Sequence, residues 1–303
     1  MQGGIAWGYV ATTLGYLAAA AWHAWATAGA GDERPARWLA RAVWVLHSAV
    51  LAAEVAGGRV PFLSATGSVY FLSWAWVLNG LLLESLLPLR ALGAFMLPPV
   101  VVLLVLVAAA AGAGPGTSAG AGAALAAGPA GGVAGAAAGS SARVALQLAG
   151  GAAPWVWLHA VIALLSYVAF GLASALAVMY LLLERQLRGK AFTGLYRRLP
   201  SLEIMDRTCW WLIGGGFALL TLALLSGSLP AGSLWGRRWA SDGKVIASAA
   251  VWLFYAGCLA LRAWAGWRGR RLAYLSLLGF AVILANYLLV GLHWSNRHVF
   301  HVF

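Results

Sequence analysis

Trp235-Gly-Arg-Arg-Trp-Ala-Ser-Asp-Gly-Lys244 is a short polar stretch with two tryptophans, and it separates two long apolar segments. These segments, at 209–229 and 245–263, each match the roughly 20 residues that an α-helix needs to cross a bilayer. A polar stretch between two such segments is typical of a loop at a membrane surface, where tryptophan is enriched. The stretch therefore predicts two membrane-spanning helices joined by a surface loop.

The composition extends this interpretation to the whole chain. Of its 303 residues, 62% are hydrophobic and 9% are charged, and the mean hydropathy is +0.83. Such values lie outside the range of soluble domains and indicate an all-α polytopic membrane protein. The net charge of +12 comes from basic residues in short loops between apolar runs. We interpret these residues as signals of membrane topology and as contacts with the lipid bilayer. We expect no nucleic-acid partner.

Eight apolar runs predict eight transmembrane helices, at 5–27, 38–56, 68–87, 91–111, 155–183, 209–229, 245–263 and 273–292. Pro98 and Pro99 mark the fourth run as the one whose helix is most prone to kink or break. The Gly- and Ala-rich segment 112–154 favours a flexible external linker over a ninth, weakly hydrophobic helix. The expected organisation is a four-helix half at 1–111, the linker at 112–154 and a second four-helix half at 155–303.

Successive loops between these helices lie on alternate sides of the membrane, and the basic residues divide unevenly between the two sides. Of the 20 lysines and arginines, the poorer side receives only Arg59, Arg143, Arg237, Arg238, Lys244 and Arg297. The positive-inside rule then places both termini, His159, the Trp235 stretch and His293 outside. The expected location is a bacterial inner (cytoplasmic) membrane.

Histidines supply the candidate ligands. His159 stands at the start of the fifth predicted helix and His293 at the end of the eighth. Two imidazoles on one side of a membrane, beside an aromatic loop, can hold a flat metal-centred ligand such as haem from both faces. His47 lies at mid-depth in the second helix, where it is either a cofactor-binding residue or a histidine bonded to a neighbouring helix. His298 and His301 form an alternative pair on the tail.

Six ordered segments resemble the haem-handling cytochrome c assembly proteins of the CcsA/ResC type and their HemX-like relatives. The stretch from Trp235 is similar to the tryptophan-rich motif of that family, WGxYWxWDPKE in outline. The other similar segments are PFLS (61–64) with FLSW (71–74), LH (158–159) with YLLLE (180–184), LPSLE (199–203), GWRGRR (266–271) and GLHWS (291–295).

This resemblance implies an external tryptophan-rich loop between two external histidines that ligate haem iron. The corresponding positions here are His159 and His293. Trp235, Trp239 and Asp242 are retained from the loop motif and are expected to bind the cofactor, which we expect to be haem b. The implied function is a haem-binding and haem-delivering membrane subunit of a c-type cytochrome assembly machinery, at most the membrane subunit of a haem-attachment synthase.

Two departures from the family pattern favour an alternative. Ser241 replaces the second tryptophan of the WxWDP part, and Ala260 stands where the stricter members carry a histidine inside the membrane. The alternative is a HemX-like accessory or regulatory membrane protein, or a small-molecule carrier, without a haem-attachment role of its own.

The expected partners follow from what the chain lacks for attaching haem. Cys209 and Cys258 lie at or inside different predicted helices, without CxxC spacing, and the Gly/Ala-rich segment has little side-chain chemistry to recognise a peptide. The surface for an apocytochrome c must therefore come from another protein. The resemblance implies a ResB-like membrane partner that carries a large external domain.

Overall fold

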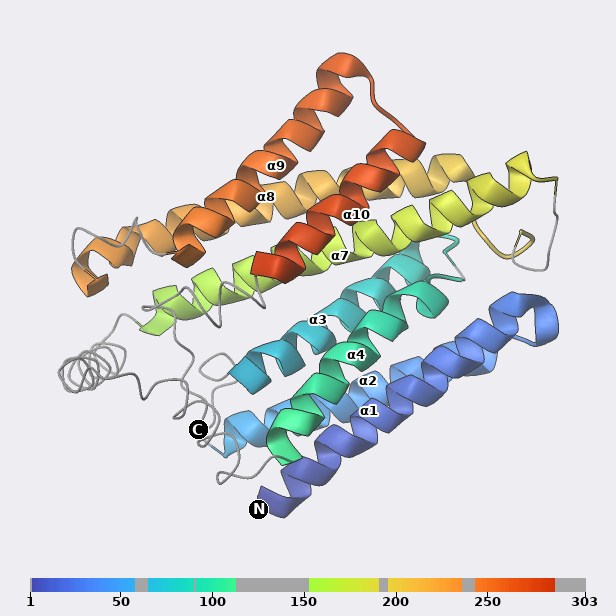
Figure 1. Cartoon of the computed structure of the whole chain (residues 1–303). Helices are drawn as coiled ribbons and strands as arrows, with labels where there is room; N and C mark the ends of the chain where they lie inside the picture. Colours follow the sequence, from blue (N-terminus) through green and yellow to red (C-terminus); the bar gives the residue numbers. More distant parts are fainter. Residues whose placement is uncertain are drawn as a thin grey trace, which may run out of the picture.

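The computed structural model describes residues 2–57, 65–89, 91–112, 153–190, 196–235 and 243–286. Within these ranges the chain forms α-helices and no strand (Figure 1). The helices are α1 (Gln2–Trp25), α2 (Arg34–Ala56), α3 (Ala65–Leu86), α4 (Leu92–Gly112), α7 (Ala153–Arg188), α8 (Leu202–Trp235), α9 (Gly243–Ala265) and α10 (Arg270–Ala285), with a π-helical turn, η1 (Ala26–Ala30), after α1.

Each predicted apolar run coincides with one of the eight α-helices in the described residues, which confirms the all-α fold. In the described residues, five helices are long and apolar enough to cross a membrane: α2, α3, α7, α8 and α9. A sixth, α4, contains the shorter apolar stretch Leu92–Val105. The protein is therefore a multi-pass membrane protein. The predicted placement of both termini outside stays a prediction.

Helix α4 passes through Pro98 and Pro99 without ending. Each proline lacks the amide hydrogen that would bond to the carbonyl one turn earlier, on Ala94 and Phe95. Transmembrane helices tolerate this loss where neighbouring helices compensate for it. Here α1 and α3 both pack against α4, and the fourth helix continues through the prolines, in agreement with the predicted run at 91–111.

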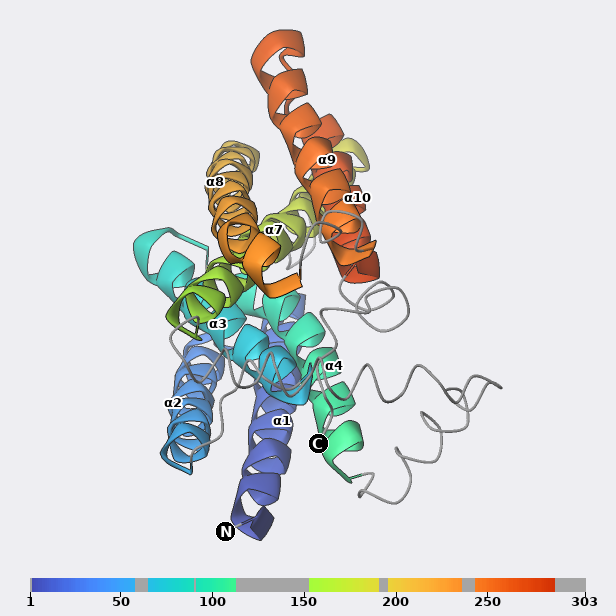
Figure 2. The ribbon, with the colours of Figure 1, turned by 90° about the vertical axis from the view of Figure 1, so that its left-hand side faces the viewer.

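The helices form two groups that meet at α7. Helices α1 to α4 share one buried cluster with α7 and with Met205 of α8, and helices α7 to α10 share the other. Figures 1 and 2 show α7 between the two groups. Its residues Leu172 and Leu176 belong to the first cluster, whereas Phe170 belongs to the second and stacks on Tyr255 of α9, with ring centroids 3.6 Å apart. The division into two halves stays a prediction, and the predicted linker lies largely outside the described residues.

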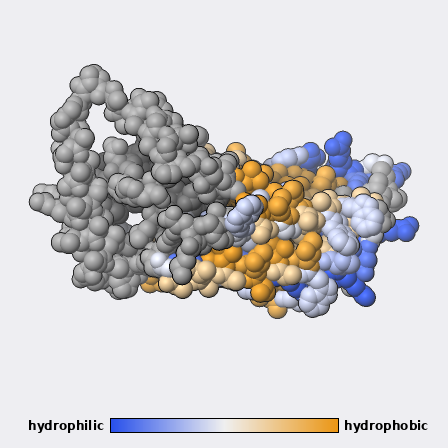
Figure 3. Space-filling model, turned by 90° about the horizontal axis from the view of Figure 1, so that it is seen from below, coloured by the Kyte–Doolittle hydropathy of each residue, from blue (hydrophilic) through white to orange (hydrophobic). Residues whose placement is uncertain are grey.

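The described lysines and arginines, apart from Lys244, gather at one end of the helices. This is the end where α1 leads into α2, α7 ends, α8 begins and α9 leads into α10. Figure 3 shows an apolar band along the helices next to this hydrophilic end. Two ion pairs brace the end, Arg198 with Glu33 at 3.3 Å and Arg262 with Asp206 at 2.9 Å. We call it the basic end.

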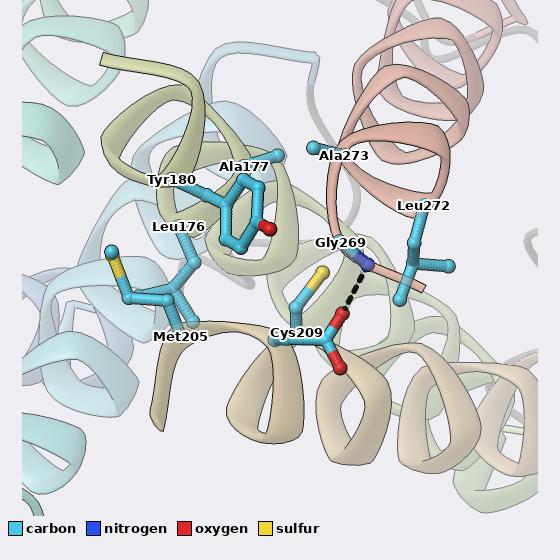
Figure 4. Close-up of a pocket in the computed structure, with 9 residues that line it drawn as sticks. Leu176, Ala177, Tyr180, Met205, Cys209, Gly269, Leu272 and Ala273 are labelled. Atoms are coloured by element: carbon cyan, nitrogen blue, oxygen red, sulfur yellow. Dashed lines mark hydrogen bonds between the residues drawn. The ribbon is translucent and has the colours of Figure 1, made fainter. Parts of the chain in front are cut away.

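At the basic end, two of the segments that resembled family motifs, YLLLE and GWRGRR, lie against each other and beside the first turns of α8. Asp206, just after the LPSLE segment, accepts a hydrogen bond from the backbone N–H of Gly269 at 2.7 Å. Tyr180 of the YLLLE segment and Gly269 of the GWRGRR segment line one small cavity, together with Cys209 (Figure 4). These segments therefore fix how α7, α8, α9 and α10 meet.

Replacing Gly269 by alanine is expected to loosen this junction. Its φ of +62° with ψ of −126° is a conformation that only glycine adopts readily. A Cβ there would also lie 2.5 Å from the Tyr180 hydroxyl oxygen. We expect a loss of about 1–3 kcal/mol, measured as a lower unfolding temperature in detergent. Gly257→Ala in α9 is the control, because among the described residues nothing outside its own helix backbone and chain neighbours lies within 4 Å of a Cβ built there. Equal unfolding temperatures for the two variants would contradict the prediction.

Candidate functional site

His159 lies near the start of α7, at the end of the molecule opposite the basic end. Its Nδ1 is 2.7 Å from the backbone carbonyl oxygen of Ala223 in α8. A carbonyl oxygen can only accept a hydrogen bond, so Nδ1 must carry the hydrogen. In the neutral imidazole the lone pair then resides on Nε2. The contact between α7 and α8 thus selects the tautomer of His159.

The backbone of α8 also fixes the position of the His159 ring. Gly227 lies one turn beyond Ala223 on α8, and a Cβ built on it would be 2.6 Å from His159 Cε1 and 2.7 Å from its Nδ1. Real Cβ atoms do not approach another side chain this closely. The ring therefore rests directly against the helix backbone, in a place that exists only because residue 227 has no side chain.

This arrangement suits an iron ligand. Histidines that bind a metal through one ring nitrogen commonly donate the other N–H to a backbone carbonyl, which fixes the orientation of the ring and raises its basicity. His159 shows this pattern and is only partly buried. The charge of Lys244, at the start of α9, also acts on His159. Lys244, the last residue of the tryptophan-containing stretch, therefore interacts electrostatically with this histidine.

The structure describes only part of the predicted haem site. Trp235, which we expected in the loop, is instead the last residue of α8. Trp239, Asp242 and His293 lie outside the described residues, and so do His298 and His301.

A polar contact deeper in the second group of helices was missed by the sequence interpretation. Asn286, which directly follows α10, donates to the Tyr167 hydroxyl of α7 at 3.3 Å and to the Ser248 hydroxyl of α9 at 3.4 Å. These bonds tie the end of α10 to α7, which carries His159, and to α9. The signal in the sequence is an asparagine within an apolar run, a residue that needs partners when it is buried.

His47 lies in the first group of helices. Its side chain is fully buried, and its ring centroid is 4.0 Å from that of Tyr70 and 5.8 Å from that of Tyr16. Helix α2 packs mainly on α1 and α3, whereas α7 packs most extensively on α8. The structure therefore does not bring His47 into the His159 site.

Comparison with known proteins gives a family match over most of the chain. The family model described as "Cytochrome C assembly protein" matches residues 62–296. "Cytochrome c biogenesis protein CcsA" of Guillardia theta is 34% identical over 165 residues, which cover 47% of this chain and 55% of that protein. The protein of the same name from Chlamydomonas reinhardtii is 30% identical over 151 residues, which cover 49% of this chain and 41% of that protein.

A third relative, also "Cytochrome c biogenesis protein CcsA", comes from Synechococcus sp. (strain JA-2-3B'a(2-13)). It is 40% identical over 103 residues, which cover 34% of this chain and 29% of that protein. The chain thus spans about half, or less, of the length of the curated relatives that it matches.

Proposed function

The chain belongs to the cytochrome c assembly protein family, and we propose that it binds haem at the external face of the membrane and presents it for attachment to c-type apocytochromes. The observation that carries this proposal is the hydrogen bond from His159 Nδ1 to the Ala223 carbonyl oxygen. It leaves Nε2 as the nitrogen that can bind iron. We place the site outside the membrane, at the end opposite the basic end.

In this proposal His159 and His293 would bind the iron from its two faces, and Trp235, Trp239 and Asp242 would contact the porphyrin. The expected form is haem b, which has no covalent bond to its carrier. The two imidazoles would hold the haem iron, and the haem would supply the group that is transferred to the apocytochrome. The part of α8 around Gly227 supports His159, and Lys244 contributes a positive charge nearby.

Partners are part of the proposal. The two cysteines are buried and free in α8 and α9, so they are not placed to reduce the thiols of an apocytochrome. We propose that a ResB-like membrane protein with an external domain provides the surface for the apocytochrome segment. The membrane would be a bacterial inner membrane, with both termini outside.

The alternative, an accessory or regulatory HemX-like protein or a small-molecule carrier, is favoured by the two departures from the family pattern, Ser241 and Ala260. Ala260 in α9 stands where the stricter relatives have a membrane histidine, so α9 contains no imidazole. The proposed and alternative functions differ in what happens when the protein is absent.

Deleting the gene from the source organism is expected to abolish covalent haem in its c-type cytochromes, because no other component would present the haem. Covalent haem is measured by the peroxidase activity of denatured proteins in gels. A plasmid copy of the wild-type gene should restore the signal, and a copy with His159→Ala should not. Full cytochrome haem in the deletion strain would contradict the proposal and support the alternative.

A further inference from the structure

The first two turns of α2 carry four residues on one side of the helix. We call them the arginine face, which consists of Arg34, Arg37, Trp38 and Arg41. Their spacings of three, one and three residues place them within about a third of the helix circumference. The buried residues of α2 lie on the opposite side, which packs on α1 and α3. Figure 2 shows α2 at the outside of the first group of helices, and the arginine face is therefore turned away from the bundle.

The three arginines of this face have no acidic partner. Within the described residues none of them forms an ion pair or donates a side-chain hydrogen bond, and the buried Nε of Arg37 has no acceptor. Other arginines at the basic end are paired with carboxylates: Arg198 with Glu33, Arg262 with Asp206 and Arg188 with Glu184. Because a buried donor of a charged group is costly without an acceptor, Arg37 indicates that an acceptor binds at this face.

Two further carboxyl groups lie near the arginine face, and both accept hydrogen bonds from the backbone. Asp32 accepts from the backbone N–H of Arg34 at 3.0 Å. Glu84 of α3 accepts from the backbone N–H of Gly93 at 2.9 Å. Glu84 also interacts electrostatically with Arg37, but it forms no ion pair with the arginine face. An excess of positive charge therefore remains on this side of α2.

The position of Arg41 along α2 favours an anion that comes from the membrane. Helix α2 is long and apolar enough to cross a bilayer, but residues 42–56 cover only about 22 Å, less than the roughly 30 Å of hydrocarbon. The helix therefore crosses only if Arg41 enters the bilayer. The Cζ of Arg41 lies 5.1 Å from the centroid of the Trp38 ring, nearly one turn closer to the basic end. The guanidinium thus reaches back toward the lipid headgroups, as long basic side chains do.

The same side of α2 continues beyond Arg41 as an apolar surface. Val45, Ala52 and Val55 follow at spacings of four, seven and three residues, which keep them on this side. All three are exposed, and the exposed fraction is 60% for both Val45 and Val55. One exposed side of α2 therefore carries positive charge at the basic end and apolar side chains toward the membrane interior.

We propose that this side of α2 binds one anionic phospholipid. The phosphate group lies against Arg37 and Arg41, and one acyl chain lies along Val45 and Ala52. A guanidinium group donates two parallel hydrogen bonds to phosphate oxygens, so the lipid supplies the acceptor that Arg37 lacks. The bound phosphate also neutralises the charge that Arg41 brings into the bilayer, where an unpaired arginine is costly.

The combination of charge and apolar surface favours a lipid over a soluble ligand. Inorganic phosphate would contact the arginines but leave the apolar side chains uncovered. A zwitterionic phospholipid brings a cation of its own next to three arginines, whereas an anionic phospholipid such as phosphatidylglycerol brings only negative charge. Clusters of basic residues at the end of a membrane helix commonly bind anionic lipids.

Native mass spectrometry of the full-length protein tests this proposal. The delipidated protein in detergent is titrated with phosphatidylglycerol and, separately, with phosphatidylcholine that has the same acyl chains. We expect wild type to bind phosphatidylglycerol at least about fivefold more tightly than phosphatidylcholine. Arg37→Gln and Arg41→Gln should each weaken the binding of phosphatidylglycerol about fivefold, because one basic residue near an anionic membrane surface contributes about that factor. An equal concentration of inorganic phosphate should not displace the lipid.

The control is Arg188→Gln, which removes the same charge from an exposed residue at the basic end that is paired with Glu184. It should bind phosphatidylglycerol as wild type does. If Arg37→Gln does not fold, the comparison rests on Arg41→Gln and on Arg34→Gln, whose side chain is exposed.

Three results would overturn the proposal. The first is equal affinity of wild type for the two lipids. The second is equal affinity for phosphatidylglycerol in wild type and in the folded variants of the arginine face. The third is displacement of the lipid by inorganic phosphate, which would indicate a site for a soluble phosphate compound.

Discussion

His159→Ala is expected to remove most of the haem from the purified protein or to leave it five-coordinate. The substitution deletes the nitrogen that the Ala223 carbonyl holds in position for iron. Loss of groups that merely orient a metal ligand already lowers metal affinity about 10–100-fold, so loss of the ligand itself should cost at least as much. Haem content is measured by visible absorption after purification from cells with ample haem.

Three further variants distinguish the loss of an iron ligand from a general loss of folded protein. His293→Ala should give the same loss, and the double variant should lose little more than either single variant, because both ligands act on one iron. His47→Ala should change haem content only modestly, since His47 lies in the other group of helices. Unchanged spectra in both His159→Ala and His293→Ala would reject these ligands and direct attention to His298 and His301.

Gly227→Ala is expected to weaken haem binding by about tenfold while the His159 side chain is retained, because displacing a correctly oriented ligand costs 10–100-fold in metal affinity. The added methyl group would lie 2.6 Å from His159 Cε1, so the ring must move and its bond to Ala223 must lengthen or break. The same haem titration on wild-type and variant protein measures the effect.

Gly215→Ala is the control for this variant. It lies in the same helix, and no atom is within 4 Å of a Cβ built on it. Exchanging glycine for alanine inside a helix is otherwise mildly stabilising, so Gly215→Ala should bind haem as the wild type does. Wild-type haem affinity in Gly227→Ala would mean that the ring position seen here is irrelevant to binding.

The sequence was sufficient to predict the helices because bilayer-length apolar runs have few alternative structures. Lipid offers no hydrogen bonds to the backbone, so a run such as 245–263 must become a helix, and α9 (Gly243–Ala265) confirms it. The prolines of α4 could only be marked as a possible kink or break, because the cost of a proline inside a helix depends on neighbours that the sequence does not identify. Trp235 was misplaced for a related reason, since α8 continues past its most apolar part.

The candidate site was less predictable than the helices. His159 was found from its place at a helix end and from a family resemblance. Its partners Ala223 and Gly227 could not be found in this way, because they lie on another helix more than 60 residues away and act through a backbone carbonyl and a missing side chain. Asn286 and its two hydroxyl partners depend in the same way on the packing of three helices.

The buried polar residues of α1, α2 and α3 could be predicted only in part from the sequence. His47 was singled out from its depth in an apolar run, but Tyr9, Tyr16 and Tyr70 are ordinary residues in membrane helices when seen one at a time. The seven-residue spacing already puts His47 and Glu54 on one face of α2, but only the packing shows that Tyr9 contacts Glu54 and that Tyr70 contacts His47.

The central claim, that this chain holds haem through His159 Nε2, is tested most directly by electron paramagnetic resonance of the oxidised, haem-loaded protein. The account predicts the low-spin signal of ferric haem with two imidazole ligands, and its replacement by a high-spin signal, or by none, in His159→Ala. A wild-type chain that takes up no haem, or a low-spin signal that persists unchanged in His159→Ala, would contradict it.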